Sequence, residues 1–174
     1  MPTSVIVMAL AATCVCSQQP KWEDSSPHRI QLVRVEDGVQ LEVLDWGGSG
    51  RALVLLAGSG HSAHIFDDLA PKLVGPCHVY GITRRGYGAS SRPESGFSAE
   101  RLGDDVLSVL DSLHLTAPVL AGHSLGGHEL TALASTHRNR AAGLIYMNST
   151  ADPTFDWGPY QELRKKLPSA MKYP

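Results

Sequence analysis

The sequence carries little net charge and lacks a long uninterrupted apolar segment. Fifteen basic and 17 acidic residues leave a formal charge of −2, so the composition gives no reason to expect a nucleic-acid partner or an anionic membrane surface. The apolar run at residues 5–12 is too short to span a bilayer, which takes about 20 residues. We therefore expect no nucleic-acid binding and no stable membrane insertion.

The short apolar run does fit the apolar region of a secretory signal. Small residues follow it, and a cut after Ser17 would remove residues 1–17 as a signal peptide, although no Lys or Arg precedes the run. Residues 18–29 then form a polar leader ahead of the folded core. This pattern predicts export to the periplasm or the medium, and a cytoplasmic location if no signal is processed.

Cysteine is also scarce, with three residues in the whole sequence. Cys14 and Cys16 fall in the signal region and are interpreted as signal or anchor residues rather than a metal pair. Cys77 would be the one thiol of the processed chain, which excludes an internal disulfide. With 174 residues and 43% hydrophobic composition, the chain is long enough for one domain that rests on its apolar core.

The folded region is predicted to begin with an antiparallel hairpin. Residues 30–35 and 39–44 alternate apolar with polar side chains on either side of Asp37-Gly38. Asp-Gly between two alternating runs is typical of a tight hairpin turn in which both central residues have positive φ.

From residue 51 onward the apolar runs become continuous, as in buried parallel strands. We expect these strands at residues 52–57, 77–82, 117–121 and 143–147. Helical patterns lie between them, at residues 65–74, at residues 99–113 with Ser98 as N-cap, and from Leu125 to about His137. The order predicts an α/β fold, with an N-terminal hairpin followed by a mostly parallel sheet that carries helices on both faces. The predicted core covers residues 30–150, and residues 151–174 read as the start of a cap inserted above the sheet.

The motif Gly122-His123-Ser124-Leu125-Gly126 follows a predicted strand directly and opens a predicted helix. In that context Gly-x-Ser-x-Gly forms a nucleophile elbow, a sharp turn that projects the serine hydroxyl above the sheet. Glycine is expected at Gly122 and Gly126 because a side chain there would collide with the neighbouring strand and helix. The Leu125 N–H lies at the helix N-terminus and would donate to an oxyanion formed by attack of Ser124.

With this motif and three further segments, the sequence resembles the α/β-hydrolase superfamily from about residue 30 to residue 165. Residues 55–59 form an apolar strand that ends in Gly58-Ser59, and residues 66–71 are similar to the helix that follows in the family. Residues 84–90 resemble the Asp-Arg-Gly-x-Gly-x-Ser turn of the family, with Arg84 in place of Asp.

The resemblance implies a second oxyanion donor and a class of reaction. The donor would be the Ser59 N–H, and Ala57 stands where many members have His, so the support of this loop must differ here. Haloalkane dehalogenases and epoxide hydrolases of the superfamily place Asp at the nucleophile position. Ser124 instead implies hydrolysis of a small ester, thioester or amide through an acyl-Ser124 intermediate, with no cofactor, or the related perhydrolase reaction.

The resemblance also implies a triad in the chain order Ser, acid, His. The histidines after Ser124 are His128 and His137, both in the helix that opens at the motif, and Asn148 holds the place where some relatives carry the acid. The sequence therefore resembles a C-terminally truncated member whose catalysis is impaired, because the triad acid and histidine are missing.

Three other histidines are candidates for the substrate pocket. His61 and His64 lie in the loop after Gly58-Ser59, and His123 precedes the serine. His61 and His64 could equally pack against the loop or face solvent. They could also approximate a metal pair, but the spacing suggests no third ligand, so no metal is predicted.

Two other interpretations stay open. Residues 58–63 match the Gly-x-Gly-x-x-Gly/Ala fingerprint of dinucleotide-binding folds, and Arg84 and Arg85 close the next strand, where they could hold the 2′-phosphate of NADP. The preceding hairpin and the serine motif fit that NADP-binding oxidoreductase poorly. The other interpretation is a non-catalytic hydrolase fragment. The oligomeric state does not follow from the sequence.

Overall fold

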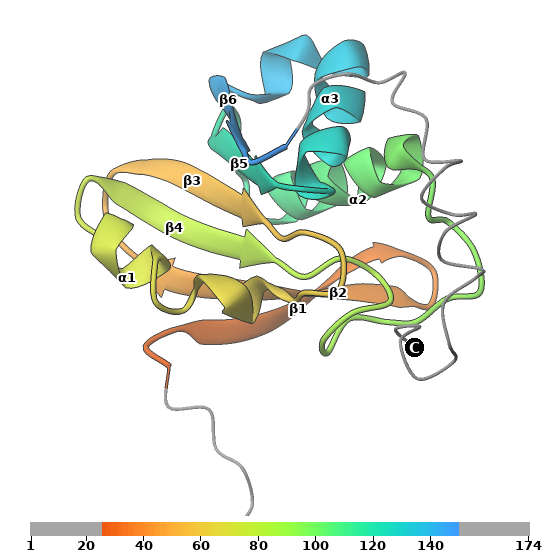
Figure 1. Ribbon diagram of the computed structural model, residues 1–174, viewed down its shortest axis with the longest axis horizontal. Helices are drawn as coiled ribbons and strands as arrows, with labels where there is room; N and C mark the ends of the chain where they lie inside the picture. The colour runs from red at the N-terminus through yellow and green to blue at the C-terminus, as the bar shows by residue number, and fades with distance from the viewer. Residues whose placement is uncertain (1–25, 150–174) are drawn as a thin grey trace, which may run out of the picture.

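The computed structural model describes residues 26–149 (Figure 1). The predicted signal peptide, most of the predicted leader and the predicted cap at residues 151–174 lie outside the described residues. Over residues 26–149, no helix combines the length and apolar character needed to cross a bilayer.

A six-stranded sheet forms the centre of the described region, in the order β1-β2-β4-β3-β5-β6. The strands are β1 (Arg29–Glu36), β2 (Val39–Gly47), β3 (Arg51–Leu56), β4 (Cys77–Ile82), β5 (Val119–His123) and β6 (Gly143–Met147). β2 pairs antiparallel with both β1 and β4, whereas β4, β3, β5 and β6 pair parallel. The predicted hairpin followed by parallel strands is confirmed.

The turn of the hairpin differs from the prediction in one respect. Gly38 has φ of +75°, but Asp37 is not among the described non-glycine residues with positive φ, so the predicted positive φ at both turn positions is wrong. The register shifts between Arg34 and Glu36. An irregularity of this kind lets a single glycine take the left-handed conformation, which it adopts without steric cost.

The helix predicted over residues 65–74 is wrong as one element. The structure divides it into a 3-10 turn, η1 (Ala63–Phe66), and a single helical turn, α1 (Ala70–Leu73). Pro71 lies in the first turn of α1, where its missing N–H costs nothing. If a helix continued from η1 through residue 71, that N–H would have to donate to a carbonyl of the preceding turn. The proline cannot make this hydrogen bond, so it separates the two elements.

The two longer helices are confirmed. α2 (Ala99–Ser112) begins at the predicted N-cap, where the Ser98 hydroxyl accepts a hydrogen bond from the Arg101 N–H at 3.2 Å. α3 (Gly126–Thr136) follows the serine motif, and a short 3-10 turn, η2 (Arg138–Arg140), leads into β6.

Helices cover both faces of the sheet, so the protein has two apolar cores (Figure 1). The α2 and α3 side is packed by side chains that include Leu56 and Leu130, and the η1 and α1 side by side chains that include Leu55 and Phe66. Leu55 and Leu56 are neighbours in β3 and enter opposite cores, because successive side chains of a strand point to opposite faces. A strand buried on both faces therefore reads as a continuous apolar run.

The parallel strands end together at one edge of the sheet. Leu56 pairs with Ile82 in β4 and with Gly122 in β5, and His123 pairs with Met147 in β6. The segments that follow these strands therefore meet at the same edge, which brings together the loop after β3, the turn after β4 and the turn at Ser124 after β5.

Candidate active site

Ser124 lies in a strained turn between β5 and α3. Its φ is +50°, in the left-handed region that a residue with a Cβ enters at a cost of roughly 1–2 kcal/mol. The Ser124 N–H donates to the Met147 carbonyl at 3.2 Å, and the Gly127 N–H donates to the Ser124 carbonyl at 3.0 Å. These bonds to β6 and to the first turn of α3 hold the serine in that conformation.

Glycines let the turn pack closely against its neighbours. A Cβ on Gly122 would lie 2.5 Å from the Gly126 carbonyl carbon, and one on Gly126 would lie 2.6 Å from the Leu56 carbonyl oxygen. Real Cβ atoms essentially never approach backbone so closely, so the first turn of α3 rests directly on β5 and β3.

The loop after β3 contacts the same turn. A Cβ on Gly58 would lie 3.0 Å from His123 Nδ1 and 3.1 Å from Ser124 Cβ. Ser59 is the next residue and is exposed, and Leu125 is the N-cap of α3. The structure therefore brings His123, Ser124 and the start of the Ser59 loop together. The roles of the Ser59 and Leu125 N–H groups as oxyanion donors stay predictions.

Arg84 connects this loop to α3. Its guanidinium donates to the Ala57 carbonyl at 2.8 Å and to the Gly58 carbonyl at 3.4 Å, and its Nε–H donates to Glu129 of α3. Both charged side chains are almost completely buried. Arg84 thus fixes the backbone just before Ser59 to the helix that follows Ser124, and this is the different support that Ala57 requires.

Burial dominates the electrostatics of this pair. Removal from water raises the pKa of Glu129 above its ordinary value, and the charge and hydrogen bond of Arg84 act in the opposite direction. A buried ion pair of this kind depends on both partners, because removal of one leaves an uncompensated buried charge.

The arginines of the NADP interpretation are both engaged in the interior. Arg84 pairs with Glu129, and Arg85, which is 1% exposed, forms a two-pronged pair with Asp105 at 2.6 and 2.7 Å. The hydrogen bonds that Arg85 donates to the Asp105 carboxylate raise the pKa of Arg85. Neither guanidinium faces outward toward a 2′-phosphate, so the structure argues against an NADP site built on them.

The remaining histidines are distributed over different parts of the fold. His61 is exposed, and the ring of His64 faces two carboxylates, with Nδ1 3.1 Å from Asp67 and Nε2 3.5 Å from Glu42. His128 lies in the first turn of α3 and His137 is its C-cap. His123 directly precedes Ser124, and the backbone of His61 donates to the Gly58 carbonyl at 3.4 Å. The roles of His61, His64 and His123 in a substrate pocket stay predictions.

Sequence reasoning did not identify Arg84 and Glu129 as partners in support of the site. The available signal was a pair of departures from the family pattern, Ala57 in place of His and Arg84 in place of Asp. Glu129 itself gave no signal in the sequence, because only the structure shows that it is buried, and charged residues are rarely buried unless they are paired.

Comparisons with known proteins agree with the fold. The sequence model of the alpha/beta hydrolase family matches residues 53–173. The AB hydrolase superfamily protein YisY of Bacillus subtilis is 31% identical over 124 residues, which are 71% of this chain and 46% of YisY. Epoxide hydrolase A of Mycobacterium tuberculosis is 31% identical over 135 residues, which are 75% of this chain and 42% of that protein.

Solved structures give the same result. One described as Est816, an N-acyl homoserine lactone degrading enzyme, superposes with a TM-score of 0.65 at 30% identity and covers 68% of this chain and 45% of its own. The chain thus spans somewhat less than half the length of these relatives.

Proposed function

This chain belongs to the alpha/beta hydrolase family, and from that premise we propose that it is the nucleophile-bearing part of a serine hydrolase that cleaves small esters, thioesters or amides. The observation that carries the proposal is the conformation of Ser124, which has positive φ at the junction of β5 and α3 and lies against the Gly58 backbone. Strain of this kind persists where the surrounding structure enforces it and is frequent at catalytic residues.

The proposed reaction follows from that position. The Ser124 oxygen attacks the substrate carbonyl, and the Leu125 and Ser59 N–H groups donate hydrogen bonds to the resulting oxyanion. Collapse of this intermediate expels the alcohol, thiol or amine and leaves an acyl-Ser124 ester, which water hydrolyses. Arg84 supports the second donor by holding the carbonyls of the two residues before Ser59.

The proton that Ser124 gives up needs a base, and the family pattern places that base on a histidine late in the chain. His128 and His137 belong instead to α3 and its C-cap. Asn148, which directly follows β6, has an amide where an acid would be needed. We therefore propose that turnover by residues 1–174 alone is impaired, and that these residues hold the nucleophile and oxyanion side of the site.

The substrate class rests on the nucleophile. A serine forms an acyl-enzyme from a carbonyl substrate, whereas the resemblance assigns Asp to the nucleophile of epoxide hydrolases. The relative Est816 is described as degrading a lactone, which is a cyclic ester. A small ester or lactone is therefore the first substrate to try.

The test is covalent labelling of the purified chain with a fluorophosphonate, followed by intact mass and peptide mapping. We expect slow formation of one adduct on the peptide that contains Ser124, because the oxyanion donors favour attack even without an efficient base. Ser124→Ala should remove the adduct. Ser112→Ala, at the exposed end of α2, is the matched control and should leave labelling unchanged.

Adduct formation that persists in Ser124→Ala would contradict the assignment of the nucleophile. A folded chain that takes up no label at Ser124 would favour the non-catalytic interpretation instead. Hydrolysis of p-nitrophenyl esters, measured in parallel, reports whether any histidine of the chain acts as base.

A further inference from the structure

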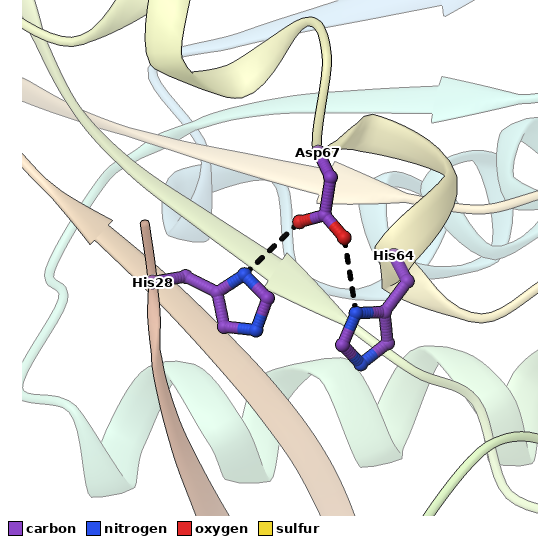
Figure 2. Close-up of side chains that lie close together, drawn as sticks. All are labelled: His28, His64 and Asp67. Carbon is purple, nitrogen blue, oxygen red and sulfur yellow. Dashed lines mark hydrogen bonds and ion pairs between the residues drawn. The ribbon is translucent and has the colours of Figure 1, made fainter. Parts of the chain in front are cut away.

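A second cluster of reactive side chains lies on the η1 side of the sheet. Figure 2 shows His28, just before β1, and His64 in η1 on either side of Asp67, which is the C-cap of η1. His28 Nδ1 is 3.0 Å from one Asp67 oxygen, and His64 Nδ1 is 3.1 Å from the other. One ligand atom from each residue lies within 4.8 Å of the other two.

A buried carboxylate lies beside the far nitrogen of His64. Its second nitrogen, Nε2, is 3.5 Å from Glu42 Oε1. Glu42 is buried and accepts a hydrogen bond from the Thr83 hydroxyl at 2.6 Å through its other oxygen. A carboxylate behind the far nitrogen of an imidazole is the usual outer partner of a metal-binding histidine, because it fixes the ring and the tautomer.

His28 is fixed by packing. Its side chain is 1% exposed, and its ring meets Trp46 edge to face at 5.5 Å and His64 at 5.0 Å between centroids. Solvent reaches the cluster through its other two members, because the side chains of His64 and Asp67 are 28% and 22% exposed. A small ion could therefore enter without rearrangement of the core.

We propose that His28, His64 and Asp67 bind one divalent transition-metal ion of the zinc type. Ligand atoms about 2.0–2.2 Å from a tetrahedral ion lie roughly 3.3 Å apart, close to the 3.0 and 3.1 Å between the Asp67 oxygens and the Nδ1 atoms of His28 and His64. Two imidazoles and one carboxylate suit zinc or iron(II) and not magnesium or calcium, which prefer oxygen ligands. With neutral imidazoles, Asp67 and Glu42 together carry a charge of −2, which one divalent ion balances.

This site is separate from the proposed serine chemistry and does not depend on it. The three ligands come from the segment before β1 and from η1, so a bound ion would tie the start of the sheet to the turn that follows the Ser59 loop. Sequence spacing could not reveal the site, because His28 and His64 lie 36 positions apart in the chain. The fold brings them together.

The test uses the full chain, freed of metal by dialysis against a chelator and then titrated with Zn²⁺ in competition with a chromogenic chelator. We expect one equivalent to bind, and binding to weaken by about tenfold or more in Asp67→Asn and in His64→Gln. His78→Gln is the matched control, because His78 also pairs with an aspartate, Asp45 at 2.8 Å, but stands outside the cluster. Its affinity for Zn²⁺ should equal that of the unmodified chain.

Circular dichroism shows whether each variant is folded, and X-ray absorption of the zinc-loaded unmodified chain provides a readout that needs no variant. We expect a shell of nitrogen and oxygen atoms that includes two imidazoles. Sulfur in the shell would assign the ion to cysteine and overturn the proposal. Fewer than two imidazoles, no binding at one equivalent, or equal affinity in the cluster variants and the control would also overturn it.

Discussion

At the scale of single residues, Arg84 has the most consequential set of contacts. One guanidinium holds two carbonyls of the loop before Ser59 and the buried carboxylate of Glu129. The planar guanidinium of arginine spreads its N–H donors over a rigid fork, so it can reach these separate acceptors together. In this chain the loop is therefore supported by Arg84, and not by a histidine at the position of Ala57.

We predict that Arg84→Gln lowers the free energy of unfolding by about 3–5 kcal/mol, because it leaves Glu129 as an uncompensated buried charge. The double variant Arg84→Gln/Glu129→Gln should recover most of this loss, since it removes both charges. Urea denaturation followed by circular dichroism measures both values. Fluorophosphonate labelling at Ser124 should remain slower in the double variant than in the unmodified chain.

The matched control for this prediction is Arg34→Gln. Arg34 pairs with Asp37 at the surface, where both side chains are largely exposed, so its loss should cost at most about 1 kcal/mol. If the losses of Arg84→Gln and of Glu129→Gln, each measured alone, simply add in the double variant, the residues are not coupled and the interpretation fails.

At the scale of elements, the junction of β5 and α3 decides the geometry of the candidate site. The strand must end and the helix must begin within two residues, and α3 must approach β3 closely enough for Gly126 to contact the Leu56 carbonyl. A side chain at Gly126 would push the helix away from the sheet and take Leu125 and Ser124 with it.

We predict that Gly126→Ala destabilises the protein by about 1–3 kcal/mol, the usual cost of overpacking. Gly143→Ala is the matched control in β6, because its Cβ would meet its nearest atom at 4.0 Å, in ordinary contact. Thermal and urea unfolding of both variants provide the measurement. Equal stability of the two variants would show that α3 yields more easily than its contacts indicate.

At the scale of the whole molecule, β1 and β6 are the two edge strands of the described sheet. Apolar side chains remain accessible at both: Ile30 and Leu32 on β1 are about half exposed, and Ile145 on β6 is 48% exposed. An edge strand with exposed apolar side chains is a template for pairing with another chain.

We predict that Ile145→Lys reduces self-association of the chain, because a charge on an edge strand opposes pairing. Size-exclusion chromatography with light scattering at rising concentration measures the effect. Ile65→Lys is the control, since Ile65 is exposed to a similar degree, 44%, but lies in η1 rather than on a sheet edge. A similar reduction in both variants would mean that general solubility, not the edge of β6, is responsible.

Much of the architecture could be predicted because local patterns determine it. Alternating side chains predicted the hairpin, and Ser98 predicted the start of α2. Continuous apolar runs predicted the ends of β3 and β4 to within one residue. Two local predictions failed where competing local effects decided the outcome. Pro71 divided the helix predicted over residues 65–74. A register shift in the hairpin left Asp37 without the positive φ that was predicted for it.

The sequence by itself determined the family resemblance and the position of Ser124, because strand, turn and helix in the motif are adjacent along the chain. Only the tertiary structure decided which distant side chains meet. Arg84 reaches Glu129 across 45 residues, and His28 reaches Asp67 across 39. Such partners are set by strand order and register in the sheet, which no short segment encodes alone.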